Sequence, residues 1–183
     1  MEIRITTQQV LKMLYIISWI LFIGICIEAG GFLFNTFFVF MKQESVKYFW
    51  QQADLTELLQ YDKGYYFTVT LTMSIVAVLR ACIFFLIIKI LHHKKLDMAQ
   101  PFSKEVRRFI FSLSYLAVLA GIFSYWGVKN VAWLEQKGVA IPDIQDLRLG
   151  GADVWLFMGV ILFVITQIFK RGIEIQSENE LTV

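Results

Sequence analysis

Four long apolar stretches dominate this sequence, and each is long enough to cross a lipid bilayer as an α-helix. A bilayer core of about 30 Å requires about 20 mostly apolar residues in helical conformation. The sequence therefore predicts an all-α fold, a membrane bundle of four transmembrane helices in a single domain over residues 1–183. We expect the helices at about residues 10–41, 65–91, 104–128 and 152–176, with a cytoplasmic tail over residues 172–183.

Composition supports the membrane class. Hydrophobic residues make up 57% of the chain and charged residues 17%, below the roughly 25% charged residues of soluble domains. The first apolar stretch exceeds the roughly 7–15 residues of a signal-peptide core, so we expect it to be retained as a helix. Cys26 and Cys82 lie inside apolar stretches without metal-ligand spacing, which predicts two buried free thiols.

The distribution of Lys and Arg predicts the orientation of the helices, because cytoplasmic loops carry an excess of these residues. With the N-terminus inside, ten of them fall in inner segments and six in outer loops. The inner basic cluster between the second and third helices comprises Lys94, Lys95, Lys104, Arg107 and Arg108. The adjoining His92 and His93 favour a solvated basic face against anionic lipid over a metal or pH-sensing site. We predict that both termini are cytoplasmic.

The loops give three local predictions. In the first outer loop, about residues 42–64, Val46, Phe49, Trp50 and Ala53 recur at helical spacing. This pattern predicts a helix lying on the outer membrane surface. Asp54 and Glu57 in the same loop resemble a capping box. In the inner loop, Ser103 is expected to be the N-cap of the third helix.

Glu28 and Arg80 are the two ionisable residues deep within the predicted helices. An unpaired charge in lipid costs several kcal/mol, so such residues face the bundle interior and seek partners. Side chains lean toward the N-terminus of their helix, and the first two helices run in opposite directions, so these two side chains converge. We predict that they form an intramembrane ion pair, which either fixes helix packing or forms an ion or proton site.

Small residues on the third predicted helix indicate close packing with a neighbouring helix. Ser114, Ala117, Gly121 and Ser124 share one face of this helix. Small side chains let membrane helices approach closely and hydrogen-bond across their interface. We therefore expect another helix to lie against this face.

Enzyme motifs are missing from the sequence, which has no GxGxxG, Walker, HExxH or CxxC pattern and no nucleophile elbow. We expect no enzymatic activity, no cofactor and no bound metal. The net charge of +2 and the lack of a helix-turn-helix pattern argue against direct nucleic-acid binding.

The C-terminal tail is acidic next to an otherwise basic membrane face. Lys170 and Arg171 end the last apolar stretch, and Glu174, Glu178 and Glu180 follow. Such a tail docks on basic residues such as Arg107 and Arg108, presents a linear signal to a cytoplasmic partner, or remains solvated. These three alternatives stay open at the level of sequence.

The same tail resembles the C-terminal signature of a bacterial family of four-helix membrane proteins, domain of unknown function 2975. Residues 167–183 read Gln-Ile-Phe-Lys-Arg-Gly-Ile-Glu-Ile-Gln-Ser-Glu-Asn-Glu-Leu-Thr-Val. The family has Asp where this chain has Glu180, and Leu where it has Ile175. Pro101-Phe102-Ser103 and Gly150-Gly151-Ala152-Asp153 also resemble the family. The resemblance covers the whole chain and implies four spans in a bacterial cytoplasmic membrane, without an established activity.

Members of that family are often encoded beside a small helix-turn-helix regulator, which implies a membrane partner for such a regulator. The leading hypothesis is a non-enzymatic membrane protein that sequesters or signals to a cytoplasmic transcription regulator. The candidate partner-binding residues are Glu174, Glu178, Asn179, Glu180 and Leu181 in the tail, with Pro101 and Phe102 in the inner loop. Alternatives are a small transporter or ion-conducting homo-oligomer centred on Glu28 and Arg80, and an accessory subunit of a larger membrane complex.

Overall fold

The chain folds into α-helices joined by short segments. The computed structural model describes residues 7–39, 53–92 and 102–180, and these residues form five helices. The helices are α1 (Thr7–Phe38), α2 (Thr56–Tyr61), α3 (Lys63–His92), α4 (Lys104–Gln136) and α5 (Ala152–Glu180). Four of them, all except the short α2, are long and apolar enough to cross a membrane. This confirms the predicted all-α fold with four membrane-spanning helices.

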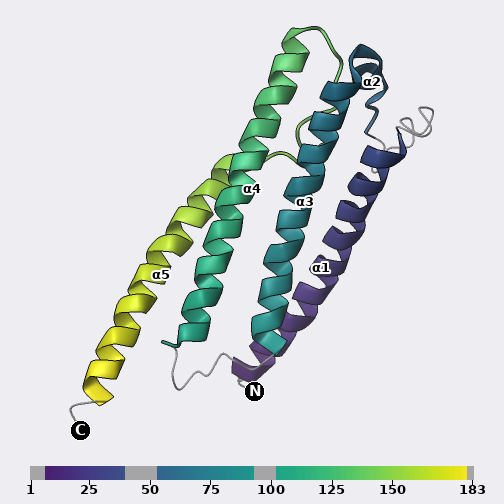
Figure 1. Ribbon diagram of the computed structural model, residues 1–183. Helices are drawn as coiled ribbons and strands as arrows, with labels where there is room; N and C mark the ends of the chain where they lie inside the picture. The colour runs from purple at the N-terminus through teal and green to yellow at the C-terminus, as the bar shows by residue number, and fades with distance from the viewer. Residues whose placement is uncertain (1–6, 40–52, 93–101, 181–183) are drawn as a thin grey trace, which may run out of the picture.

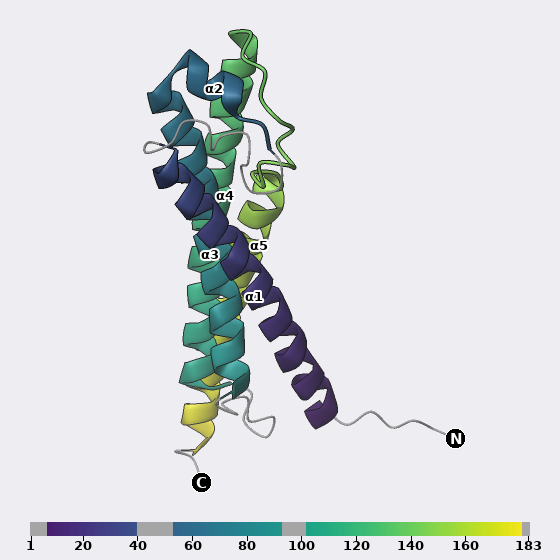
Figure 2. The same ribbon diagram turned by 90° about the vertical axis from the view of Figure 1, so that its right-hand side faces the viewer.

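The four long helices lie in a row in the order α1, α3, α4, α5, as Figure 1 shows. The main contacts join α1 to α3, α3 to α4 and α4 to α5, so α1 and α5 form the two edges. Figure 2 shows α1 inclined across α3. The start of α1 and the end of α5 lie at one end of the molecule, here called the termini end, and α2 lies at the opposite loop end. Which end faces the cytoplasm remains a prediction of the Lys and Arg distribution.

Helices α4 and α5 both extend beyond their predicted ends. α4 has 33 residues, or about 50 Å of helix, whereas a bilayer core measures about 30 Å. Its apolar run ends near Val128, but the chain meets no helix-terminating residue until Gly138, which has a left-handed φ of 84°. α4 therefore continues past the apolar run at the loop end, and α5 carries most of the predicted tail as helix.

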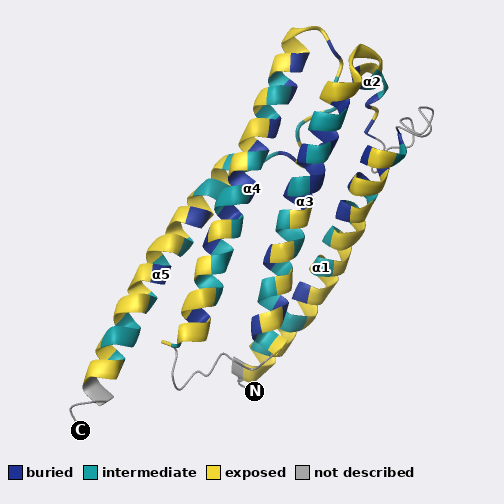
Figure 3. Ribbon diagram, in the orientation of Figure 1, coloured by how far each residue is buried: buried dark blue, intermediate teal, exposed yellow. Residues whose placement is uncertain are grey.

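The hydrophobic core lies in the loop half of the molecule, where Figure 3 shows buried residues concentrated on α3, α4 and the segment 137–151. Its fully buried side chains include Phe32 of α1, Leu58 of α2, Tyr66 of α3, Leu134 of α4 and Leu149 of segment 137–151. The side chain of Glu57 on α2 accepts a hydrogen bond from the Ala140 amide at 3.1 Å. Five chain segments thus share one core at the loop end.

Outer loop one differs from its prediction where it is described. Val46, Phe49 and Trp50 lie outside the described residues, while Ala53 is buried in the core. The N-cap of α2 is Leu55 and not Asp54, whose side chain accepts from the Thr56 amide at 2.9 Å. The predicted helix on the membrane surface would contact lipid. The described part of the loop instead packs against protein, because α2 contacts α3 and buries Leu58. The capping-box prediction is therefore wrong.

The N-cap of α4 and its small-residue face follow their predictions. The Ser103 hydroxyl accepts a hydrogen bond from the Val106 amide at 3.2 Å. Along the interface with α5, the Ser114 hydroxyl donates to the Gly159 carbonyl at 2.8 Å. Ser114, Ala117, Gly121 and Ser124 are all buried. The small face thus lies against α5, as expected from its composition.

Substitution of Gly159 by Ala is expected to lower the thermal stability of the detergent-solubilised protein. A Cβ atom at Gly159 would lie 2.6 Å from Val118 Cγ2 and 3.0 Å from the Val118 nitrogen, so the two helices must separate. Overpacking of this kind costs about 1–3 kcal/mol. Gly24→Ala is the matched control, because its Cβ would meet nothing within 4 Å and Ala favours helix by about 1 kcal/mol. Equal melting temperatures for the two variants would contradict this packing.

Candidate functional site

The residues selected from the sequence fall into two regions, one inside the bundle and one at the termini end. The first region depends on Arg148, which lies in a tight turn between α4 and α5. The Leu149 amide donates to the Ile144 carbonyl at 3.1 Å, and the Arg148 amide donates to the Gln145 carbonyl at 3.0 Å. With the left-handed φ of 56° at Arg148, these bonds form a Schellman turn, in which Gly usually holds this position.

The left-handed conformation is unfavourable for arginine by roughly 1–2 kcal/mol. Strained backbone of this kind persists where the surrounding structure enforces it, and it concentrates at functional sites. Leu147 and Leu149 on either side of Arg148 are fully buried, which anchors the turn. The position of Arg148 thus indicates that its side chain has a specific partner.

That partner is Glu28 on α1. Arg148 Nε donates to Glu28 Oε1 at 2.8 Å, joining residues 120 positions apart in the chain. The Glu28 side chain is 16% exposed and the Arg148 side chain 48% exposed, so the carboxylate is the more enclosed partner. The ion pair ties segment 137–151 to the first helix.

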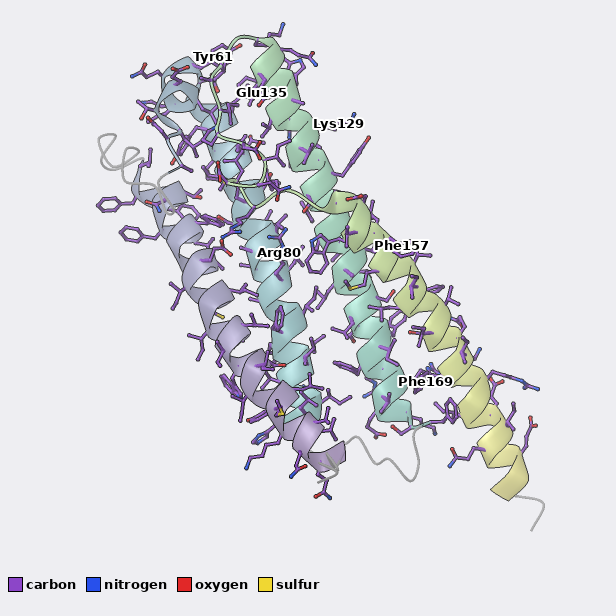
Figure 4. All side chains as sticks on the ribbon, turned by 180° about the vertical axis from the view of Figure 1, so that it is seen from behind. Tyr61, Arg80, Lys129, Glu135, Phe157 and Phe169 are labelled. Atoms are coloured by element: carbon purple, nitrogen blue, oxygen red, sulfur yellow. The ribbon has the colours of Figure 1, made fainter. Side chains whose placement is uncertain are left out.

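Arg80 on α3 lies beside this ion pair and contacts Trp155 at the start of α5. Its guanidinium carbon is 5.5 Å from the centre of the Trp155 ring, within the range of a cation–π contact. Glu28 and Arg148 both act on its charge electrostatically, and its Nε is buried without a hydrogen-bond partner. Figure 4 shows Arg80 on α3 at about the level of Phe157.

The predicted pair of Glu28 with Arg80 stays a prediction, and Arg148 joins it as a further partner of Glu28. The convergence argument brings the two residues to one site, but the described hydrogen bond to Glu28 comes from Arg148. The reason is the path of segment 137–151, which carries Arg148 inward to α1. We call Glu28, Arg80, Arg148 and Trp155 the charge cluster.

Glu28 and Arg80 lie at one level along their helices. At the termini end, the Tyr15 hydroxyl of α1 and His92 Nδ1 of α3 are 3.0 Å apart. From this contact the helical rise is about 20 Å to Glu28 and about 18 Å to Arg80, so the two residues reach the same level. The intramembrane location predicted for both residues requires a core of about 30 Å that begins near this contact. Two cations and one anion at this level form a link between helices, held by charge and cation–π contacts.

Sequence reasoning missed Arg148 and Trp155 as members of this site. Arg148 is one of the six Lys and Arg residues of the predicted outer loops, and Trp155 lies at the start of the last apolar stretch. The signal that could have found Arg148 is its place between two leucines directly before Gly150-Gly151. This pattern suits a buried turn better than a solvated loop.

The second region lies at the termini end, where the start of α4 meets α5. The Phe102 ring lies 5.2 Å from the Phe169 ring, centre to centre. A Cβ at Gly172 would lie 2.5 Å from Phe102 Cδ1, so only Gly allows this approach. The inner loop and the tail, which the sequence singled out separately, are therefore in contact through Phe102.

The remaining predicted residues are distributed around this contact. Glu174 pairs with Arg171 at 3.2 Å, both partners being largely exposed. Glu178 is exposed on the last described turns, and Asn179 and Glu180 belong to α5 although their side chains are not described. Lys104, Arg107 and Arg108 are exposed on the first turns of α4. Lys94, Lys95, Pro101 and Leu181 lie outside the described residues.

Metal-binding arrangements are not found in the part of the chain that the structure describes, which contains no group of three His, Cys, Asp or Glu side chains suited to a metal. Cys26 and Cys82 are free. They are exposed on the surfaces of α1 and α3, which corrects the prediction that these thiols are buried.

Comparison with known proteins places the chain in a family. Residues 50–183 match the family model described as "Protein of unknown function (DUF2975)". The chain belongs to this family. The match covers α2 to α5 and includes Arg80, Arg148 and Trp155, whereas α1 with Glu28 precedes it. No curated protein and no solved structure matches the chain. Family membership and four apolar helices together identify a multi-pass membrane protein.

Proposed function

We propose that this member of the DUF2975 family is a non-enzymatic membrane protein that holds a cytoplasmic helix-turn-helix regulator at the termini end. The observation that carries the proposal is the contact of Phe102 with Gly172 and Phe169. It joins the inner loop and the acidic tail into one surface, here called the termini surface. Family members are often encoded beside such a regulator, which suggests the identity of the partner.

The form of α5 supports this role. Its 29 residues form one helix of about 43 Å, longer than a bilayer core of about 30 Å. Lys170 and Arg171 follow the apolar run at the point where a helix leaves the bilayer. Beyond them, α5 presents Glu174 and Glu178 on a rigid support, one turn apart. DNA-binding domains are basic, so an acidic helix offers them a complementary surface.

The exposed pair of Glu174 with Arg171 does not prevent partner binding. Its side chains are 43% and 64% exposed, and exposed ion pairs contribute at most about 1 kcal/mol. A partner with a basic surface competes with Arg171 at little cost. Binding should therefore weaken as salt concentration rises.

Charge reversal in the tail is expected to abolish capture of the regulator encoded by the adjacent gene. The variant Glu174→Lys with Glu178→Lys should lower co-purification by at least about tenfold, because charge pairing becomes repulsion. Glu135→Lys with Asp146→Lys is the matched control, since it makes the same change of charge on exposed residues at the loop end. The measurement is the amount of regulator retained on the immobilised full-length protein. Equal capture by both variants would remove the tail from the proposal.

The charge cluster fits a structural role within the same proposal. Glu28 is engaged by Arg148 and Arg80 by Trp155, so the cluster holds α1, α3, α5 and segment 137–151 together. A transporter centred on Glu28 and Arg80 predicts loss of substrate flux in Glu28→Gln without loss of stability. Our proposal predicts the reverse, with stability as the affected property.

A further inference from the structure

A cavity of about 260 Å³ lies between α4 and α5 at the termini end. Its lining residues are Arg107 and Phe111 of α4 and Thr166, Gln167 and Lys170 of α5. Pockets for drug-sized ligands measure about 300–1,000 Å³. This cavity is smaller and therefore suits a compact polar group.

The charge of the cavity is positive. Arg107 and Lys170 approach it from different helices, and Gln167 adds an amide donor. The Thr166 hydroxyl is engaged with the Leu162 carbonyl at 2.9 Å. None of the described lining residues is acidic. Two cations and an amide donor without a carboxylate are the groups that bind a phosphate.

The side chains next to the cavity become apolar toward the middle of the bundle. Phe111 lies one helical turn from Arg107, and its ring centre is 6.3 Å from that of Phe163 on α5. Both rings are about half exposed, at 48% and 47%. The charged cavity thus lies nearer the termini end, and the two exposed aromatic rings lie nearer the middle of the bundle. A phospholipid lying along the helices has the same arrangement, with its charged headgroup at the end and its acyl chains toward the middle.

We propose that this cavity binds the phosphate of an anionic phospholipid whose acyl chains lie over Phe111 and Phe163. Basic pockets between transmembrane helices at the membrane surface bind such headgroups. A soluble phosphate compound would meet the same cations, but it would make no contact with the adjoining aromatic pair. The exposed rings therefore favour a lipid over a soluble anion. The site is independent of any protein partner.

Native mass spectrometry of the full-length protein in detergent tests this proposal. The delipidated protein is titrated with phosphatidylglycerol, with zwitterionic phosphatidylcholine, and with glycerol 3-phosphate as the soluble phosphate. We expect phosphatidylglycerol to be retained at lower concentration than both. Arg107→Gln with Lys170→Gln should weaken its binding by about thirtyfold, since each basic residue near anionic lipid contributes about fivefold.

The matched control is Arg108→Gln with Arg171→Gln. It removes the same charge one residue along each helix, from side chains that do not line the cavity. Its affinity for phosphatidylglycerol should stay within about twofold of the unmodified protein, because neither side chain lines the cavity and a bound headgroup is held by the cations of its own pocket. Equal losses in both variants would show general attraction to the helix ends and overturn the site. Equal binding of phosphatidylcholine, or of glycerol 3-phosphate, would overturn the assignment to an anionic lipid.

Discussion

Replacement of Glu28 by Gln is expected to lower the free energy of unfolding by about 3 kcal/mol, the lower end of the range for breaking a buried ion pair. The change leaves the cations Arg80 and Arg148 near each other without the carboxylate that offsets their charges. The lower end of the range applies because Arg148 is 48% exposed. The measurement is the midpoint of unfolding in mixed detergent micelles, compared with the unmodified protein.

Substitution of Arg148 by Gln is expected to destabilise the unmodified protein but to stabilise the Glu28→Gln variant. Arg148→Gln alone should cost only about 1 kcal/mol, because the side chain is half solvated and Arg80 still neutralises Glu28. Added to Glu28→Gln, the same substitution should restore stability, since it removes the repulsion between the two arginines. Arg171→Gln, which breaks the exposed pair with Glu174, is the control and should change little. A double variant less stable than Glu28→Gln would contradict the charge cluster.

Truncation of Leu149 to Ala should have an effect of similar size, about 2–5 kcal/mol. Leu149 is fully buried, and a Cβ added at Gly127 of α4 would lie 3.0 Å from Leu149 Cδ1. The leucine thus lies in the space that Gly127 leaves open and holds segment 137–151 against α4. Its loss should loosen the turn that carries Arg148 and accelerate amide hydrogen exchange across residues 143–149.

Leu21→Ala is the control for this substitution. Leu21 is 45% exposed on the surface of α1, so its truncation leaves no cavity and should change stability by less than about 0.5 kcal/mol. If Leu21→Ala and Leu149→Ala shift the unfolding midpoint equally, the packing of segment 137–151 against α4 does not stabilise the core at the loop end. A shift confined to Leu149→Ala supports it.

Hydropathy predicted the spans correctly because length and apolar composition alone determine whether a helix crosses a membrane. A close neighbour of α4 was also predictable, though not its identity as α5, since small residues such as Gly121 and Ser114 mark a close approach. Helix direction led to the expectation that Glu28 and Arg80 converge, and helical rise from the contact of Tyr15 with His92 places both at one level. Each of these predictions rests on the geometry of a single helix.

The parts that could not be predicted depend on the path of irregular backbone. Nothing in helix geometry indicates that segment 137–151 turns inward, or that Arg148 takes a left-handed conformation and reaches α1. The contact of Phe102 with Gly172 depends likewise on how the inner loop enters α4. Loop conformation is determined by tertiary packing, which periodicity and composition do not encode.

The arrangement of the helices in a row has a consequence for biogenesis. Each long helix packs mainly on the one made before it, so it can find its partner in the bilayer soon after it is inserted. Among the described hydrogen bonds, the one between Glu28 and Arg148 spans the greatest distance in the sequence, 120 positions. It can close only when most of the chain has been synthesised. Formation of this bond therefore marks the completion of assembly, and a chain that stops before Arg148 leaves Glu28 without this partner.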